Sequence, residues 1–205
     1  MNITKLIIST DTQIAETIIE RLSMKSVEKT DLYSIYEVIR TSEADDEDER
    51  VVLTVCSDSK DSITEALTHI YETYQVFKII HIGLVWVSGN VDIHSGDIVL
   101  PNTFISPESK EPFFLDFAVG ENYDFKNFWL ILSGICMTGE LSDDHDPEDY
   151  GADIYDNQSF FILEDLKEKE SLDKIVVIKW VFDSAQDTKK ETVIDNSLAI
   201  LDFIL

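Results

Sequence analysis

KIIHIGLVWVSGNVDIHSGDIVLP, residues 78–101, is the stretch that decides the fold of this chain. Its first part, Ile79 to Val87, is rich in β-branched residues and too short for a helix, which is typical of a buried strand. The run ends at the turn signal Ser88-Gly89-Asn90, and a second turn at Ser95-Gly96-Asp97 leads into the apolar run Ile98-Val99-Leu100. A buried strand, a glycine turn and a short strand after Gly-Asp form a scaffold that can hold a small ligand against backbone.

The sequence on both sides of this stretch predicts strands that alternate with helices. Short runs of apolar residues, or apolar residues at every second position, indicate strands. Apolar residues at helical spacing after N-cap residues indicate helices. The expected strands are Leu6–Ile8, Tyr33–Thr41, Val51–Val55, Trp129–Cys136 and Lys174–Phe182. The expected helices are Gln13–Leu22, Ser62–Tyr74, Phe160–Lys169 and Glu191–Leu205. N-cap residues precede the first and third of these helices, at Ser9–Thr12 and Asp156–Ser159.

This alternation predicts the α/β class, with helices on both faces of the sheet. We expect one domain over residues 1–205, a three-layer αβα sandwich around a central mixed, strongly twisted sheet. The segment from Phe113 to Trp129 does not fit the alternation, because its aromatic residues follow neither a helical nor a strand period.

The net charge of the chain restricts the classes of partner that the protein can bind. The chain has 41 acidic and 16 basic residues and a net charge of −25, with acidic runs at Asp45–Glu49 and Asp143–Asp149. Such a charge repels phosphate backbones and anionic lipid. We therefore expect that the protein binds neither nucleic acid nor a membrane surface. A role as a mimic of DNA is the one exception that such a charge leaves open. We expect no cofactor and no metal, because the run around His145 lacks the spaced oxygens and central glycine of a calcium loop.

The two cysteines favour a reducing compartment. Cys56 and Cys136 lie in apolar contexts, so we interpret them as small buried hydrophobes and not as a disulfide. The first residues lack the layout of a signal peptide, and no apolar stretch approaches the roughly 20 residues of a membrane span. We expect a cytoplasmic protein.

Four short motifs follow one another along the chain. They are Gly96-Asp97-Ile98-Val99, Thr138-Gly139-Glu140, Asp156-Asn157-Gln158-Ser159-Phe160-Phe161 and Phe182-Asp183-Ser184-Ala185. Their order, together with that of the strands and helices, resembles the purine nucleoside phosphorylase and nucleosidase superfamily, in the branch that holds methylthioadenosine/S-adenosylhomocysteine nucleosidase. The resemblance covers nearly the whole chain. It implies the nucleoside phosphorylase-like fold and suggests that the chain is a divergent member of this superfamily.

The resemblance also implies roles for individual residues. Asp183 takes the place of the family's general acid, which protonates the leaving nitrogen of the base. Gln158 takes the place of the glutamate that holds the ribose hydroxyls, or Asp156 does so if the register shifts by two. The other substrate-binding positions implied are Gly83, Ser88, Gly89, Thr138 and Asn157.

The chain departs from the family pattern at several of its functional positions. Asp11 is followed by Thr12, Gln13 and Ile14, none of them acidic, near the first strand, where nucleosidases place the acid that activates water. Leu84 to Val87 fill the family's glycine-rich loop, and Ser57-Asp58-Ser59-Lys60 replaces its phosphate-side Gly-x-Gly-Lys. Lys60 and Lys179 are the only basic residues near the aligned loops. Two functions remain open: weak hydrolysis of the N-glycosidic bond of a nucleoside or related compound, or a non-catalytic descendant of the fold that binds a ligand or supports assembly.

Each of these residues also has a purely structural interpretation. Asp183 can cap a helix or form a turn, and Asn157 and Gln158 can cap the helix that follows them. His81 lies in a buried strand and is expected to be a core histidine with a hydrogen-bond partner. Trp86 and Trp129 are expected in the core.

We predict a homodimer. The segment from Phe113 to Trp129 is too apolar to stay in contact with water, so a second copy of the chain is expected to cover it. Light scattering at micromolar concentration measures the mass directly. A monomer mass under these conditions would count against the prediction.

Overall fold

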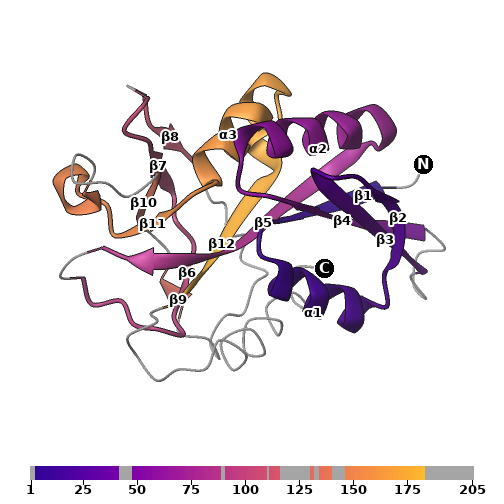
Figure 1. Cartoon of the computed structure of the whole chain (residues 1–205), viewed down its shortest axis with the longest axis horizontal. Coiled ribbons are helices and arrows are strands. Elements are labelled where there is room, and N and C mark those ends of the chain that lie inside the picture. The colour runs from indigo at the N-terminus through magenta and orange to yellow at the C-terminus, as the bar shows by residue number, and fades with distance from the viewer. Residues whose placement is uncertain are drawn as a thin grey trace. The chain divides into compact units, whose positions relative to one another are not determined.

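The computed structural model describes residues 3–41, 48–88, 91–109, 111–115, 130–131, 134–139 and 146–182. The chain forms two compact units, unit 1 from Met1–Ile82 with Lys174–Val176 and unit 2 from Gly83–Asp173 with Val177–Leu205. Strands β5 (Val76–Val87) and β12 (Ile175–Val181) contribute residues to both units (Figure 1). The single domain over residues 1–205 stays a prediction.

Unit 1 contains a mixed sheet. Its strands are β1 (Ile3–Ser9), β2 (Lys25–Lys29), β3 (Tyr33–Thr41), β4 (Asp48–Cys56) and the first part of β5, in the order β2-β3-β4-β1-β5. β1 is parallel to β4 and β5, and β3 is antiparallel to β2 and β4. Ile7 of β1 lies between Leu53 and Ile80, and all three side chains are fully buried. The mixed sheet expected from the sequence is confirmed.

Two helices flank this sheet. Helix α1 (Thr12–Leu22) starts where the Asp11 carboxylate accepts the Ile14 N–H at 3.0 Å, which satisfies one of the free donors of the first turn. Helix α2 (Lys60–Thr73) starts at Ser59, whose hydroxyl accepts the Ser62 N–H at 3.3 Å. The two helices lie on opposite sides of the strands of unit 1 (Figure 1). The expected helix–sheet–helix layering is therefore present within unit 1.

Unit 2 is built from short strands. They are the end of β5, β6 (Ile98–Val99), β7 (Thr103–Ile105), β8 (Phe113–Phe114), β9 (Leu130–Ile131), β10 (Ile135–Thr138), β11 (Ile154–Asp156) and most of β12. One path runs β5-β11-β10-β7-β8, and β12 pairs with β6, which pairs with β9. β10 is parallel to β7 and β11, whereas β11 is antiparallel to β5. The described elements also include two 3₁₀ helices, η1 (Pro147–Tyr150) and η2 (Leu172–Lys174).

Helix α3 (Ser159–Glu168) belongs to unit 2 and follows β11 directly. Its buried side chains include Phe160, whose ring lies 4.8 Å from the ring of Phe113 in β8. This contact fixes the start of α3 against the strands. The geometry matters because the candidate site lies at this helix start.

The Gly96-Asp97 motif has a structural role in unit 2. Gly96 has a φ of +99°, which favours glycine, and its N–H donates to the Val181 carbonyl at 3.0 Å. The Asp97 side chain accepts the His94 N–H at 2.8 Å, and the Asp97 carbonyl accepts the Val181 N–H at 3.0 Å. The turn thus joins β6 to β12.

Several sequence-based expectations need correction. The strand expected at Trp129–Cys136 is two strands, β9 and β10, with Gly134 between them. β2, β7, β8 and β11 were not expected, because β2 is polar and the other three have only two or three residues. Trp129 and the closing helix expected at Glu191–Leu205 lie outside the described residues.

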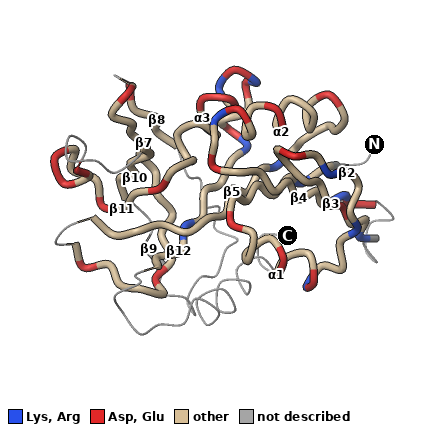
Figure 2. Tube along the Cα trace, in the orientation of Figure 1, with Lys and Arg blue, Asp and Glu red and all other residues tan. Residues whose placement is uncertain are grey.

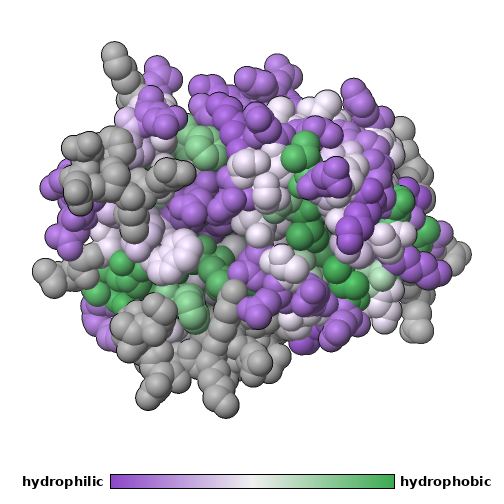
Figure 3. All heavy atoms as spheres, viewed as in Figure 1, coloured by the Kyte–Doolittle hydropathy of each residue, from purple (hydrophilic) through white to green (hydrophobic). Residues whose placement is uncertain are grey.

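Acidic residues lie on several elements of the described chain. Figure 2 shows Asp and Glu along α2, α3 and the segment of η1. On the face shown in Figure 3, hydrophilic residues surround separate apolar patches. Within the ranges that the structure describes, no helix combines the length and the apolar character that a membrane crossing requires.

Both cysteines are free thiols in buried positions, as expected. Burial raises the pKa of the Cys56 thiol to about 12, with a smaller contribution from the charge of Asp58. Burial also raises the pKa of the Cys136 thiol well above its usual value, and the charge of Asp156 adds to this. The reactive thiolate is therefore rare at both positions.

We predict that neither thiol reacts with a disulfide reagent in the native protein at pH 8. Both should react at the rate of free cysteine in concentrated urea, because unfolding restores the ordinary thiol pKa of about 8.5. The measurement is the absorbance of the released thiolate over time. Rapid labelling of one equivalent without urea would show that a cysteine is more accessible than described.

Candidate functional site

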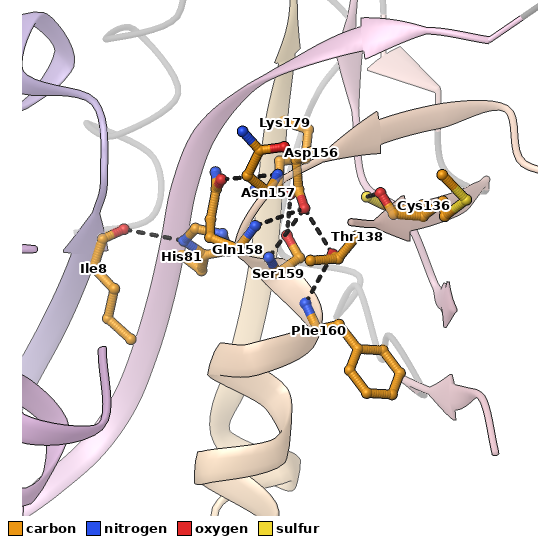
Figure 4. Close-up of polar contacts among 11 residues, drawn as sticks. Ile8, His81, Cys136, Thr138, Asp156, Asn157, Gln158, Ser159, Phe160 and Lys179 are labelled. Atoms are coloured by element: carbon orange, nitrogen blue, oxygen red, sulfur yellow. Dashed lines mark hydrogen bonds and ion pairs between the residues drawn. The ribbon is translucent and has the colours of Figure 1, made fainter. Parts of the chain in front are cut away.

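A buried carboxylate lies at the point where β11 ends and α3 begins. Asp156, the last residue of β11, is 0% exposed. Its Oδ1 accepts the Thr138 hydroxyl at 2.7 Å and the backbone N–H groups of Gln158 and Ser159 at 3.1 and 3.0 Å (Figure 4). Asp156 therefore caps α3 from three positions before its first residue, Ser159.

The second carboxylate oxygen has a charged partner. Lys179 of β12 is also 0% exposed, and its Nζ lies 2.7 Å from Asp156 Oδ2. The Ser159 hydroxyl donates to the same oxygen. We call Thr138, Asp156, Ser159 and Lys179 the Asp156 cluster. A buried ion pair of this kind is stable only when hydrogen bonds also satisfy its remaining polar atoms, as they do for this carboxylate.

Thr138 links β10 to the same helix start. Its hydroxyl donates to Asp156 and accepts the Phe160 N–H at 2.9 Å. The register of the parallel strands places Thr138 directly opposite Asp156, so the two side chains meet on one face of the sheet. The backbone N–H groups of Gln158, Ser159 and Phe160 are therefore all bonded to protein acceptors.

Asn157 and Gln158, the two other residues of this motif, lie just before the first turn of α3. Gln158 is 6% exposed, and its Oε1 accepts the Asn157 N–H at 3.2 Å. Asn157 is half-buried. Gln158 stands at the N-cap position without a side-chain bond to the helix. The capping that the sequence suggested for Asn157 and Gln158 is performed by Asp156 and Thr138.

The glycine and serine positions lie along or after β5. Gly83 is buried inside this strand, which continues as far as Val87, so it does not open a loop. Ser88 is 4% exposed, and its N–H donates to the Asp153 carbonyl at 2.9 Å. Gly83 and Ser88 are separated by five residues of extended chain, roughly 17 Å. Gly89 lies outside the described residues.

Trp86 is not a core residue, contrary to expectation. It is 37% exposed, and its ring stacks on Tyr155 with 5.6 Å between ring centroids and 22° between the planes. The antiparallel register of β5 and β11 pairs the two residues directly. Burial raises the pKa of the Tyr155 hydroxyl, with a smaller effect from Asp146. The stacked pair places bulk at the end of β5.

The remaining candidates separate into two groups. His81 in unit 1 is fully buried, and its Nδ1 lies 3.2 Å from the Ile8 carbonyl, which confirms the core histidine. Asp183 and His145 lie outside the described residues, so their roles stay predictions. Among the residues whose placement is described, no three His, Cys, Asp or Glu side chains gather as metal ligands would.

Sequence reasoning missed two members of the Asp156 cluster. The sequence alone indicates Lys179 only as a cation near the aligned loops and Ser159 only as one of four capping residues. A lysine inside the apolar run of β12, Ile175 to Val181, is itself a signal, because a charge in a buried strand needs a partner. Asp156 is such a partner on another segment, but only the folded structure shows that the two meet.

Comparisons with known proteins address the fold. No family model matches the sequence, and no curated protein is significantly similar to it. Among solved structures, futalosine hydrolase of Helicobacter pylori is 11% identical, with a TM-score of 0.79 over 99% of this chain and 97% of that one. The 5'-methylthioadenosine/S-adenosyl homocysteine nucleosidase of Campylobacter jejuni is 15% identical, with a TM-score of 0.75 over 100% and 96%.

A third structure is a nucleosidase in complex with an inhibitor. The 5'-methylthioadenosine/S-adenosylhomocysteine nucleosidase of Neisseria meningitidis with methylthio-immucillin-A is 18% identical, with a TM-score of 0.69 over 94% of this chain and 90% of that one. The agreement covers nearly whole chains although few residues are shared. The expected α/β fold with a mixed sheet and flanking helices is confirmed, and it is the fold that these nucleosidase and futalosine hydrolase structures share.

Proposed function

We propose that this protein cleaves the N-glycosidic bond of a nucleoside or related compound, weakly and by hydrolysis. The fold supports the class of reaction by analogy, because the similar structures are nucleosidases and a futalosine hydrolase. The observation that carries the choice of hydrolysis is the start of α3, where the N–H groups of Gln158, Ser159 and Phe160 are all occupied by side chains of the same unit.

The reaction needs one acid and one water molecule. The oxygen of water forms a bond to the anomeric carbon, while the bond from that carbon to the base nitrogen breaks. Asp183 gives its proton to the departing nitrogen, and the water proton restores the acid, so the products are a free sugar and a free base. Asp183 lies four positions after Lys179 in the sequence. We propose that it acts as the general acid of this reaction.

Phosphorolysis would need an anion site. Free backbone N–H groups at a helix start, or Arg and Lys side chains, form such sites. At α3 the described N–H groups are bonded within the protein, and Lys179 is buried against Asp156. The net charge of −25 also disfavours phosphate at long range.

We infer that Gln158, and not Asp156, takes the sugar-binding position. The Asp156 carboxylate is fully buried and already accepts bonds from Thr138, Ser159 and Lys179. Asn157 and Gln158 supply the amide groups next to it, and Thr138 holds the segment in place. A neutral amide forms hydrogen bonds about half as strong as a carboxylate does, so turnover is expected to be low.

The alternative is a non-catalytic descendant of the fold that binds a ligand or supports assembly. The specific observation that favours it is the bulk of Trp86, which stacks on Tyr155 where the family pattern has glycine. Bulk at such a position prevents the close approach of backbone to a ligand. Binding of methylthioadenosine in a calorimeter without release of a base would support this alternative.

We also propose a homodimer in the cytoplasm. Phe114 of β8 is 71% exposed, and a second copy of the chain would remove this surface from water. The two buried free thiols are compatible with a reducing compartment. A nucleoside-like small molecule is the proposed ligand.

We predict slow release of free base from adenosine, inosine or methylthioadenosine, with no stimulation by phosphate. Chromatography of the products separates the base from a free sugar or a sugar phosphate. Asp183→Asn should lower the rate by at least about tenfold, because general acid catalysis contributes roughly 10² to 10⁴ in rate.

Two outcomes would contradict this prediction. Phosphate-stimulated turnover on the order of 1–10 per second, an ordinary enzyme rate, would overturn the argument from the occupied N–H groups. A rate unchanged by Asp183→Asn would remove Asp183 as the acid. Asp173→Asn, at an exposed residue of the 3₁₀ helix η2, is the matched control and should leave the rate unchanged.

We predict that Gln158→Glu increases turnover. A carboxylate at this position binds sugar hydroxyls more strongly by about 1–3 kcal/mol, which corresponds to roughly ten- to a hundredfold in rate. The variant retains the oxygen that accepts the Asn157 N–H. Steady-state rates of base release, compared with Gln158→Ala, test this. Equal rates for the glutamate and alanine variants would show that residue 158 does not bind the sugar.

A further inference from the structure

We propose that Lys179 is a positioning residue, which keeps the Asn157–Gln158 segment in its binding geometry through the charge of Asp156. This inference rests on the proposed function, because it concerns the segment assigned to the sugar. Lys179 itself is fully buried against Asp156 and is assigned no contact with substrate.

The argument begins with the state of the Asp156 carboxylate. At least five groups of the described residues donate to it, namely the Thr138 hydroxyl, the Gln158 N–H, the Ser159 N–H, the Ser159 hydroxyl and the Lys179 ammonium (Figure 4). Both oxygens must act as acceptors for all five bonds to exist. A carboxylate meets this requirement only when it is ionised, because a protonated acid turns one oxygen into a donor.

Lys179 supplies the positive charge that keeps Asp156 ionised. Burial away from water disfavours the ionised form of a carboxylate, and a nearby opposite charge restores it. With a neutral residue at position 179, Asp156 is expected to take up a proton. One of the bonds to Ser159 or to the helix N–H groups is then lost.

The lost bond lies next to the binding segment. The Gln158 N–H donates to Asp156, and Gln158 Oε1 accepts the Asn157 N–H, so both ends of this residue are held by neighbours. Loosening the Asp156 contact frees the backbone of Gln158 and with it the amide proposed to bind the sugar. The charge at position 179 therefore affects ligand affinity indirectly, through the contact of Asp156 with Gln158.

The test compares Lys179→Met with Lys179→Arg and with Val177→Ala. Val177 is a buried residue of the same strand and has no polar group, so it serves as the control for packing loss in β12. Amide hydrogen exchange is measured by NMR at Gln158, Ser159 and Phe160 and is divided by the exchange rate at Ile178 in the same variant. The dissociation constant or KM for methylthioadenosine is measured in parallel.

We expect Lys179→Met to accelerate exchange at the three amides by about tenfold relative to Ile178, since one hydrogen bond of average strength corresponds to roughly this factor. The dissociation constant or KM should rise by a similar factor. Lys179→Arg keeps the charge and should restore most of both. Val177→Ala should change neither the exchange rate relative to Ile178 nor the dissociation constant or KM.

Equal acceleration in Lys179→Met and Val177→Ala would overturn the inference, because it would show a general loss of stability. Protected amides in Lys179→Met would overturn it as well. If Lys179→Met does not fold, Lys179→Gln replaces it, with the same expectation. Wild-type protein that neither cleaves nor binds nucleosides would contradict the proposed function, and the exchange comparison would still decide whether Lys179 positions the segment.

Discussion

Lys179 and Asp156 carry opposite charges at a place from which water is excluded. Removing each charge from water costs several kcal/mol, so the pair is tolerated only with good geometry and full hydrogen bonding. The structure meets this condition with Thr138 from β10, Ser159 from α3 and Lys179 from β12. Removing one partner of such a pair costs about 3–5 kcal/mol, because the other charge is left uncompensated. Three segments of unit 2 therefore depend on one contact.

The same contact limits the chemistry that the chain can perform. A helix start is an anion site only while its N–H groups are free. Here Asp156 and Thr138 use the N–H groups of Gln158, Ser159 and Phe160, and Lys179 neutralises Asp156. The groups that would attract phosphate at this helix start are thus used inside the protein. A reaction with water needs no such site, and this supports the proposal of hydrolysis over phosphorolysis.

The sequence predicts elements well where side chains decide them locally. The bounds of β3 at Tyr33–Thr41 agree with the structure because the partial alternation there indicates a strand, and Asp11 caps α1 as its position indicates. The polar strand β2 and the three-residue β11 gain their partners from neighbouring strands, which no local pattern shows. The sequence predicts Trp86 in the core, but its ring is partly exposed. The prediction is wrong because burial depends on what covers a strand, which the sequence of that strand does not show. The site follows the same division: the sequence indicates a capping motif at Asp156, and only folding reveals Lys179 as its partner.

The choice between Asp156 and Gln158 shows why a motif alone does not define a function. Both residues lie in one short motif, and a register shift of two exchanges them. The structure distinguishes them by their surroundings, because a carboxylate that already accepts five bonds gains little from a ligand hydroxyl. The acid of this motif has become part of the core, and an amide stands next to it. A fold shared at 10–18% identity does not determine the chemistry, because the function depends on which groups of the site a ligand can reach.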